Sequence, residues 1–233
     1  MNVQADLILH SLQEVAAERA SRRADPALAA RVGEVKRYQH RRFQHTYADL
    51  LASPRYGRSA RFFLEDLYGP EDFTRRDEQF ARVVPGLTRL FPRELVGTVI
   101  SLGELHALSE QFDTAMARVI GSAALDDGDY AAAWRTVGRP ADRERQIELM
   151  LAVGSALDRY TRNPLIRTSL RVMRGPAAVA GLAALQGFLE RGFDTFSEMR
   201  GAREFLDTVA ARERELAARL FAGGSAAGGS AVV

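Results

Sequence analysis

The sequence predicts an all-α protein, a single bundle-like domain of about 8–10 helices with no β-sheet. Apolar residues recur every three or four positions in nearly every window, and no stretch alternates between apolar and polar residues as a half-buried strand does. The 233 residues are 46% hydrophobic and 27% charged, which is typical of a globular protein that buries a substantial core.

Two helices are predicted in the N-terminal part. Asp25 and Pro26 favour an N-cap and a first-turn proline, and Ser53-Pro54 ends the helix that follows them. The apolar positions of the first helix are Leu7, Ile8, Leu12 and Val15. Those of the long second helix are Leu28, Val32, Val35, Phe43, Tyr47, Leu50 and Leu51.

The middle of the chain predicts three helices. The first is short, Arg58–Tyr68, and Gly69-Pro70 stops it. Thr74 with Asp77 forms a capping arrangement for the second. Pro92 begins a long third helix that runs to about Ile120.

Five more helices are predicted in the C-terminal part. Asp129 can cap a short one, and Pro140 or Asp142 begins another that reaches about Tyr160. Asn163-Pro164 begins a short basic helix that ends at Gly175-Pro176. The last two helices have amphipathic stripes, formed by Leu182, Leu185, Leu189, Phe193 and Phe196 and by Phe205, Leu206, Val209, Leu216 and Leu220.

No linker rich in Pro, Gly or Ser divides this helical part, so one domain is expected over residues 1–221. Residues 222–233 are rich in Gly, Ser and Ala and are expected to form a flexible tail. The last two helices are amphipathic and contain small residues, so a homodimer could form by packing these helices against those of a second copy.

Composition excludes several classes of protein. The chain has no cysteine, which rules out disulfides, thiolate metal sites and cysteine nucleophiles. Lys36 is the only lysine among 32 basic residues, and the net charge of +2 is too small by itself to indicate a nucleic-acid or membrane partner. No apolar run approaches the ~20 residues of a membrane span. We expect a cytoplasmic protein.

Known catalytic and metal-binding motifs are missing from the sequence. It contains no dinucleotide or phosphate-binding glycine loop, no nucleophile elbow and no zinc-protease motif. Asp126-Asp127-Gly128-Asp129 lacks the alternating ligands of a calcium loop, so a turn with a helix cap is predicted there. No catalytic residue, metal ligand or resident cofactor is therefore assigned.

His106 is the candidate binding residue. It lies in the middle of the long helix from Pro92, on or beside the buried stripe, with Glu110 one turn later. It can be a core-edge histidine bonded to a carboxylate or carbonyl, an axial ligand of a haem or bilin, or an acid–base group held by Glu110.

Two rows of arginines are candidate sites for an anion or an acidic partner. Arg37, Arg41 and Arg42 lie in "KRYQHRRFQHTY" on the second helix, where rings and cations interleave. This mixture also suits nucleic acid, but Phe43 and Tyr47 are needed for the apolar side of the helix, so a solvated basic face is favoured. On the short basic helix the row is Arg167, Arg171 and Arg174, for which pairing with carboxylates elsewhere is expected.

The stretch "FFLEDLYGPEDFTRRDEQF" is similar to the signature of an uncharacterised proteobacterial family, a domain of unknown function. Similar features continue through "ELHALSEQFDTAMA", "RQIELM", "NPLIRTSLRVMRGPA" and "FLERGFDTF", which together cover roughly Tyr47 to Glu213. The resemblance implies a bacterial, cytoplasmic and wholly helical protein, and it implies no activity.

A weaker likeness is to globin-like proteins, whose proximal histidine lies on a helix in a run such as "ELHALS". It implies haem or bilin binding through His106, with Phe62, Phe63 and Tyr68 lining the pocket. No distal histidine can be assigned, and the helix continues well past His106.

The function that the sequence favours is that of a non-enzymatic helical binding or regulatory protein, which acts through a protein partner or a small ligand. The alternatives are a haem- or bilin-binding sensor that uses His106, an enzyme that uses His106 with Glu110, and a nucleic-acid binder that uses Arg37, Arg41 and Arg42.

Overall fold

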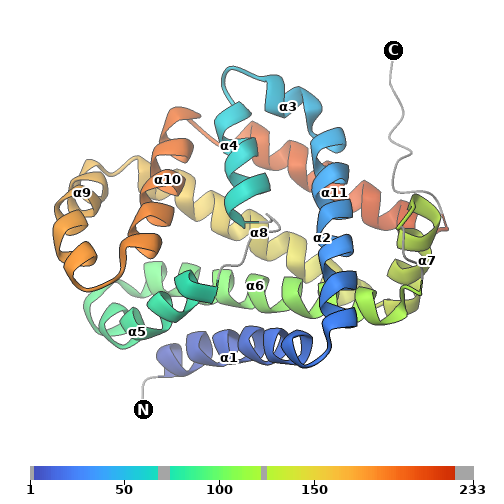
Figure 1. Cartoon of the computed structure of the whole chain (residues 1–233). Helices are drawn as coiled ribbons and strands as arrows, with labels where there is room; N and C mark the ends of the chain where they lie inside the picture. Colours follow the sequence, from blue (N-terminus) through green and yellow to red (C-terminus); the bar gives the residue numbers. More distant parts are fainter. Residues whose placement is uncertain (1–2, 68–73, 122–124, 224–233) are drawn as a thin grey trace.

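The structure is a computed structural model, and it describes residues 3–67, 74–121 and 125–223. These residues form eleven α-helices and one π-helical turn, and the described ranges contain no strand (Figure 1). The all-α prediction is therefore confirmed. In the order of the chain, the elements are α1 (Val3–Ala24), α2 (Pro26–Thr46), α3 (Ala48–Ala52), α4 (Gly57–Phe62), the π-helical turn η1 (Phe63–Leu67), α5 (Thr74–Leu90), α6 (Arg93–Val119), α7 (Asp127–Val137), α8 (Pro140–Thr161), α9 (Pro164–Val179), α10 (Ala183–Glu198) and α11 (Arg203–Phe221).

Capping side chains explain where several helices begin. Asp25 Oδ1 accepts a hydrogen bond from the amide of Leu28 at 3.0 Å, with Pro26 in the first turn of α2. Asn163 caps α9 in the same way through the amide of Leu165. The cap of α7 is Asp126, whose Oδ1 accepts from the amide of Asp129. Asp129, the predicted cap, lies inside the helix instead.

The helices outnumber the prediction because the expected second helix breaks at Tyr47. Its backbone leaves the helical region, with φ −116° and ψ 25°, so α2 ends and the short α3 begins. The Tyr47 ring is fully buried, and its hydroxyl donates to Glu213 Oε1 on α11 at 2.6 Å. The break thus fixes the end of α2 to the last helix.

Helix α9 is longer than predicted. It continues past Gly175-Pro176 to Val179. Proline removes one amide donor, but its fixed φ is compatible with a helix, so the chain can remain helical through Pro176. The predicted corner at Gly69-Pro70 lies outside the described residues.

Helix α6 is the centre of the arrangement (Figure 1). It packs against α1 and α2, against α8 and against the shorter α7, while α8 in turn contacts α10 and α11. Helices α9 and α10 form a hairpin at one edge of the molecule. None of the described helices combines the length and apolarity needed to cross a bilayer.

Aromatic residues form much of the core between α4, η1, α10 and α11. Phe63 packs beside Phe196 and Phe205, with ring centroids 5.8 and 5.6 Å apart. Phe62 stacks on Phe188 at 5.6 Å. A Cβ at Gly192 would lie 3.0 Å from Phe62 Cζ, so this glycine allows α10 to approach the aromatic core closely.

Candidate functional site

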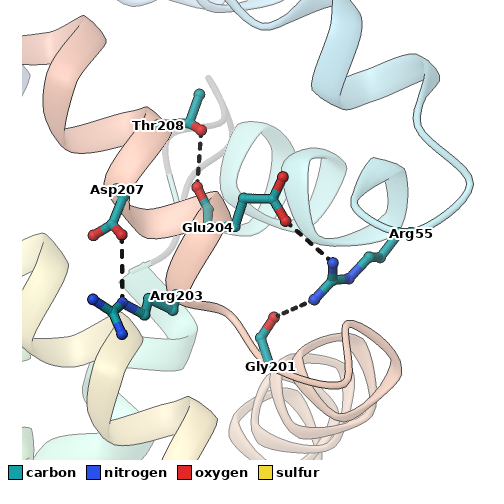
Figure 2. Close-up of a pocket in the computed structure, with 6 residues that line it drawn as sticks. All are labelled: Arg55, Gly201, Arg203, Glu204, Asp207 and Thr208. Carbon is teal, nitrogen blue, oxygen red and sulfur yellow. Dashed lines mark hydrogen bonds and ion pairs between the residues drawn. The ribbon is translucent and has the colours of Figure 1, made fainter.

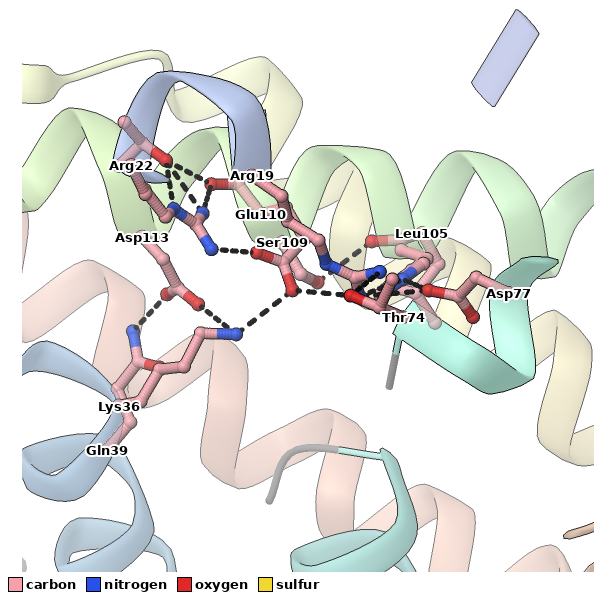
Figure 3. Close-up of polar contacts among 12 residues, drawn as sticks. Arg19, Arg22, Lys36, Gln39, Thr74, Asp77, Leu105, Ser109, Glu110 and Asp113 are labelled. Atoms are coloured by element: carbon pink, nitrogen blue, oxygen red, sulfur yellow. Dashed lines mark hydrogen bonds and ion pairs between the residues drawn. The ribbon is translucent and has the colours of Figure 1, made fainter. Parts of the chain in front are cut away.

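Seven ionisable side chains from four helices meet between α1, α2, α5 and α6 (Figure 3). They belong to residues separated by up to 94 positions in the chain, and most of them are largely removed from solvent. We call this group the charge cluster; its members are Arg19, Arg22, Lys36, Asp77, His106, Glu110 and Asp113.

Glu110 is the central carboxylate of the charge cluster, with a side chain only 4% exposed. Arg22 Nη1 donates to its Oε2, and Lys36 Nζ donates to its Oε1 at 3.0 Å. Burial raises the pKa of Glu110, but the positive charges of Lys36 and Arg22 outweigh burial and lower it to about 2. The carboxylate is therefore ionised and ties α1 and α2 to α6.

Asp113 lies one turn after Glu110 on α6 and has fewer polar partners than Glu110. Gln39 Nε2 donates to its Oδ1 at 3.1 Å, and Lys36 Nζ lies 3.4 Å from its Oδ2. Burial raises the pKa of Asp113, and the nearby charge of Glu110 adds to the increase, so the attraction of Lys36 does not restore the ordinary value. Lys36 is thus shared between two carboxylates.

His106 is bonded to Asp77 rather than to Glu110. Its Nε2 lies 2.9 Å from Asp77 Oδ2, and the side chain is 18% exposed. Arg19 Nη2 is also 2.9 Å from Asp77 Oδ2 and 3.4 Å from His106 Nε2. Burial raises the pKa of Asp77, but the hydrogen bond from His106 and the charges of Arg76 and Arg19 lower it overall. The sequence predicted Asp77 as a helix-capping residue and did not associate it with His106.

The aromatic residues expected around His106 lie elsewhere in the fold or outside the described residues. Phe62 and Phe63 are buried against rings of α10 and α11, as described above, and no described ring contact joins them to His106. Tyr68 lies outside the described residues. His106 does not line the hollow beside Gly201 that is described later in this subsection.

The three arginines of α2 have different surroundings. Arg37 pairs with Glu34 on the surface at 2.5 Å. Arg42 is largely buried, and its Nη1 donates to Glu213 Oε1 at 2.5 Å. Arg41 is exposed and has no ion-pair partner among the described residues. The row therefore does not form one continuous basic surface.

The arginines of α9 face α10. Arg167 pairs with Asp194 at 3.1 Å, and Arg174 donates from Nε to Glu190 Oε1 at 2.6 Å. Arg171 is exposed, and no ion pair joins it to another described residue.

Beside these arginines, α9 exposes an apolar row that the sequence analysis did not separate from the core. Ala177 is the only buried residue of the helix. Leu165, Val172 and Val179 are 73%, 69% and 93% exposed, and their spacing of seven residues places them on one side of α9. Thr168 and Gly175 lie between them on the same side. We call these five residues the α9 face.

A hollow of about 420 Å³ lies where α10 turns into α11, and the protein's own contacts occupy its polar groups (Figure 2). Arg55 donates to Glu204 Oε2 and to the Gly201 carbonyl, both at 3.2 Å. Arg200 and Gly201 have φ values of 53° and 119°, so Arg55 secures a tight turn. The hollow is a structural corner.

The fold and the charge cluster together define an all-helical protein in which buried ion pairs join the N-terminal helices to the central one. The chain belongs to a family described as Domain of unknown function (DUF8198), which matches residues 18–227. This confirms the prediction that the chain belongs to a family whose domain has no known function. The same comparisons found no match among curated proteins or solved structures.

Sequence reasoning missed Arg19, Arg22, Lys36 and Asp113 as members of one site. Their partners lie 55–92 positions away along the chain, so no local motif links them. The one available signal was compositional: Lys36 is the single lysine in a chain that otherwise uses arginine.

Proposed function

We propose that this protein acts by binding another protein through the α9 face, and that the bound segment is a helix with acidic residues beside an apolar seam. The observation that carries the proposal is the exposure of Leu165, Val172 and Val179 along one side of a helix that buries only Ala177. An apolar row of this kind, rimmed by polar residues, is a mark of interaction surfaces.

The spacing of the α9 face suits a helical partner. Leu165, Val172 and Val179 repeat every seven residues, as the a positions of a coiled-coil seam do. Thr168 and Gly175 occupy the intervening d positions, and a Cβ at Gly175 would meet no atom within 4 Å. The small residues leave holes that side chains of a second helix can fill.

Charge favours an acidic partner over a second copy of this chain. Helix α9 contains three arginines and no acidic residue. Arg167 and Arg174 already pair with carboxylates of α10, and Arg171 has no ion pair with another described residue. A symmetric dimer through α9 would bring the two copies of Arg171 close together, whereas an acidic helix would pair with Arg171. A lipid surface is disfavoured because the apolar row is narrow and lacks the large aromatic residues of membrane-surface helices.

The alternative functions have weaker support. Haem or bilin ligation would require His106 Nε2 to leave Asp77, and Phe62 and Phe63 to leave the core. Two of the three α2 arginines already have carboxylate partners, which weakens the case for nucleic acid. As the resemblance implied, the proposal includes a cytoplasmic location in a bacterium.

Site-specific photo-crosslinking tests this function. A photo-crosslinking amino acid placed at Val172 should capture a partner in cells, and mass spectrometry of the joined peptides should locate an acidic amphipathic helix. Purified partner should then bind the wild-type protein, with an affinity that falls as salt is added. Val172→Glu should weaken binding by about tenfold or more.

Val119→Glu is the matched control, because Val119 is a 44% exposed valine on α6. It should leave binding unchanged. Crosslinks from Val172 only to lipid, only to a second copy or to a segment without acidic residues would reject the proposal, as would equal losses in the two variants.

A further inference from the structure

Arg143, near the start of α8, is a buried cation whose hydrogen bonds are not satisfied by the described part of the protein. The residue is only 4% exposed. Its guanidinium carbon lies 3.5 Å from the centre of the Phe112 ring on α6 and 3.7 Å from that of the Trp134 ring on α7. Its Nε and Nη2 are buried and have no hydrogen-bond partner among the described residues. Arginines this deeply buried are normally paired, so Arg143 calls for an explanation.

The two unpaired nitrogens form one edge of the guanidinium. Their N–H bonds point in parallel, so a single carboxylate can accept hydrogen bonds from both. The same edge does this two residues later in α8, where Arg145 donates from Nε and Nη2 to the two carboxylate oxygens of Glu104 at 2.8 and 2.9 Å. In Arg143 this edge has no acceptor among the described residues. Its geometry is therefore that of a carboxylate-binding group.

Trp134 adds a third donor at this place. Its indole nitrogen is also buried and has no hydrogen-bond partner in the described ranges. Because the Trp134 ring lies against the guanidinium of Arg143, this nitrogen is only a few ångströms from it. An indole N–H can only donate, as can a guanidinium. All three unpaired groups thus require an acceptor.

The charge of Arg143 also lacks a bonded counter-ion among the described residues. Burial opposes the positive charge and lowers the pKa of Arg143 to about 10, and interactions with Tyr130 and Asp113 offset this only in part. Asp113 accepts from Gln39 and lies 3.4 Å from Lys36 instead. Water can accept the hydrogen bonds but brings no charge, whereas an anion supplies both.

We infer that Arg143 and Trp134 bind the carboxylate of a small organic acid where α6, α7 and α8 meet. A planar carboxylate matches the two parallel donors of the guanidinium and balances its single positive charge. A phosphate would bring up to two negative charges into surroundings formed largely by aromatic rings, where unpaired charge is costly. This site is separate from the α9 face.

The ligand can reach Arg143 only when neighbouring side chains move, because Nε and Nη2 are shielded from water. Arg139 is one neighbour that can do so. Its guanidinium carbon lies 4.8 Å from the centre of the Phe112 ring, and its side chain is 40% exposed and pairs with Asp142 at the surface. Association should therefore be slower than at an open site.

The site can be observed directly, because Trp134 is the only tryptophan in the chain. Its fluorescence and its indole N–H resonance are followed in the full chain during titration at constant ionic strength. The probes are acetate, propionate and benzoate, and the comparisons are acetamide, inorganic phosphate and chloride. At least one carboxylate should shift the indole resonance saturably and bind roughly tenfold or more tightly than any comparison.

Three variants locate the ligand. Arg143→Lys keeps a positive charge but removes the two-donor edge, so it should weaken carboxylate binding by roughly tenfold or more. Arg143→Met should lose binding and, without ligand, should unfold at the same temperature as the wild type or higher, because it removes a buried unpaired charge. Arg145→Met, which removes an exposed pair on the same helix, is the matched control and should bind as the wild type does.

Each remaining result overturns the inference. No saturable shift with any carboxylate removes the site, and an equal response to acetamide, phosphate or chloride removes the carboxylate. Unchanged binding in Arg143→Lys, or an equal loss in Arg145→Met, would place the ligand elsewhere. Destabilisation of ligand-free Arg143→Met would show that the ring contacts alone account for the buried cation. None of these results bears on the α9 face.

Discussion

The charge cluster and α9 treat their side chains in opposite ways. In the charge cluster, the charged side chains of α1, α2, α5 and α6 are largely buried and form ion pairs with one another, whereas α9 exposes arginine and aliphatic side chains to solvent. Glu110 is surrounded by Arg19, Arg22 and Lys36. On α9, Val172 and Val179 face water, and Arg171 has no ion pair with another described residue. Buried charges therefore hold the N-terminal helices in place, and exposed apolar residues leave a surface for another molecule.

This comparison separates stability from function. Removing one member of a buried ion-pair group leaves an uncompensated charge and is strongly destabilising. Changing an exposed side chain with few neighbours costs little. The two regions should thus respond oppositely to mutation: the charge cluster through the free energy of unfolding, and the α9 face through binding.

The largest effect is expected from Glu110→Gln. It leaves Arg22 and Lys36 partly buried without their shared carboxylate, so the free energy of unfolding should fall by about 3–5 kcal/mol in chemical denaturation. Glu190→Gln, which removes the partner of Arg174 beside α9, is the matched control and should cost a small fraction of that. Equal losses in the two variants would contradict the distinction between the regions.

The second-largest effect is expected from acid, which should reduce the stabilisation that the charge cluster gives to the fold. The pKa of Glu110 in the folded protein is about 2, below its ordinary value of 4.5, so between these values the folded state binds fewer protons than the unfolded state. Its stabilisation is complete above about pH 5 and is lost as the pH falls through 4.5 towards 2, by roughly 3 kcal/mol.

The raised pKa of Asp113 has the opposite effect on stability. Folding favours the protonated form of Asp113, so its contribution to the free energy of unfolding decreases as the pH rises. Glu110→Gln isolates the part due to Glu110. Chemical denaturation across this pH range should show that the free energy of unfolding depends less steeply on pH in Glu110→Gln than in the wild type. An equally steep dependence would refute the assignment of this effect to Glu110.

Lys36→Met should have an intermediate effect. Glu110 keeps Arg22, but Asp113 loses its closest cation and keeps only Gln39, so a loss of about 2 kcal/mol is expected. Lys36→Arg should also destabilise, because a planar guanidinium does not replace a compact ammonium between two carboxylates. Both variants are compared by thermal denaturation with Arg37→Met, which removes an exposed ion pair and should change the stability little. If Lys36→Arg were as stable as the wild type, a guanidinium would fit between the two carboxylates and the prediction would be wrong.

The smallest effect on folding is expected on the α9 face. Val172→Glu should change the free energy of unfolding by less than about 0.5 kcal/mol, because the side chain is already solvated. Circular dichroism and denaturation should therefore match the wild type while partner binding is lost. A large loss of stability would mean that Val172 packs within the fold.

Local signals in the sequence were sufficient for the fold class and for several helix starts. Asp25-Pro26 and Asn163-Pro164 combine a capping side chain with a first-turn proline, and both begin helices as predicted. Tyr47 was predicted inside a helix because its apolar ring fits the stripe; its hydrogen bond to Glu213, 166 residues away, could not be inferred.

The charge cluster was beyond sequence reasoning for the same reason. Glu110 was associated with His106 because they lie one turn apart, but His106 bonds to Asp77 from another helix. The apolar residues of α9 posed a different difficulty. Periodicity reveals that Val172 and Val179 share a side of the helix, and it cannot reveal whether that side faces the core or solvent.

The long separation between Arg22 and Glu110 also affects how the protein emerges from the ribosome. The two are 88 residues apart, so at 5–20 residues per second roughly 4–18 s pass between their syntheses. During this interval α1 and α2 have neither α6 to pack on nor the carboxylates that neutralise them. We expect these nascent helices to be held by chaperones, and ribosome-bound chains stalled before residue 90 to be digested readily by protease. Resistance to protease at that length would show that the N-terminal helices fold without their later partners.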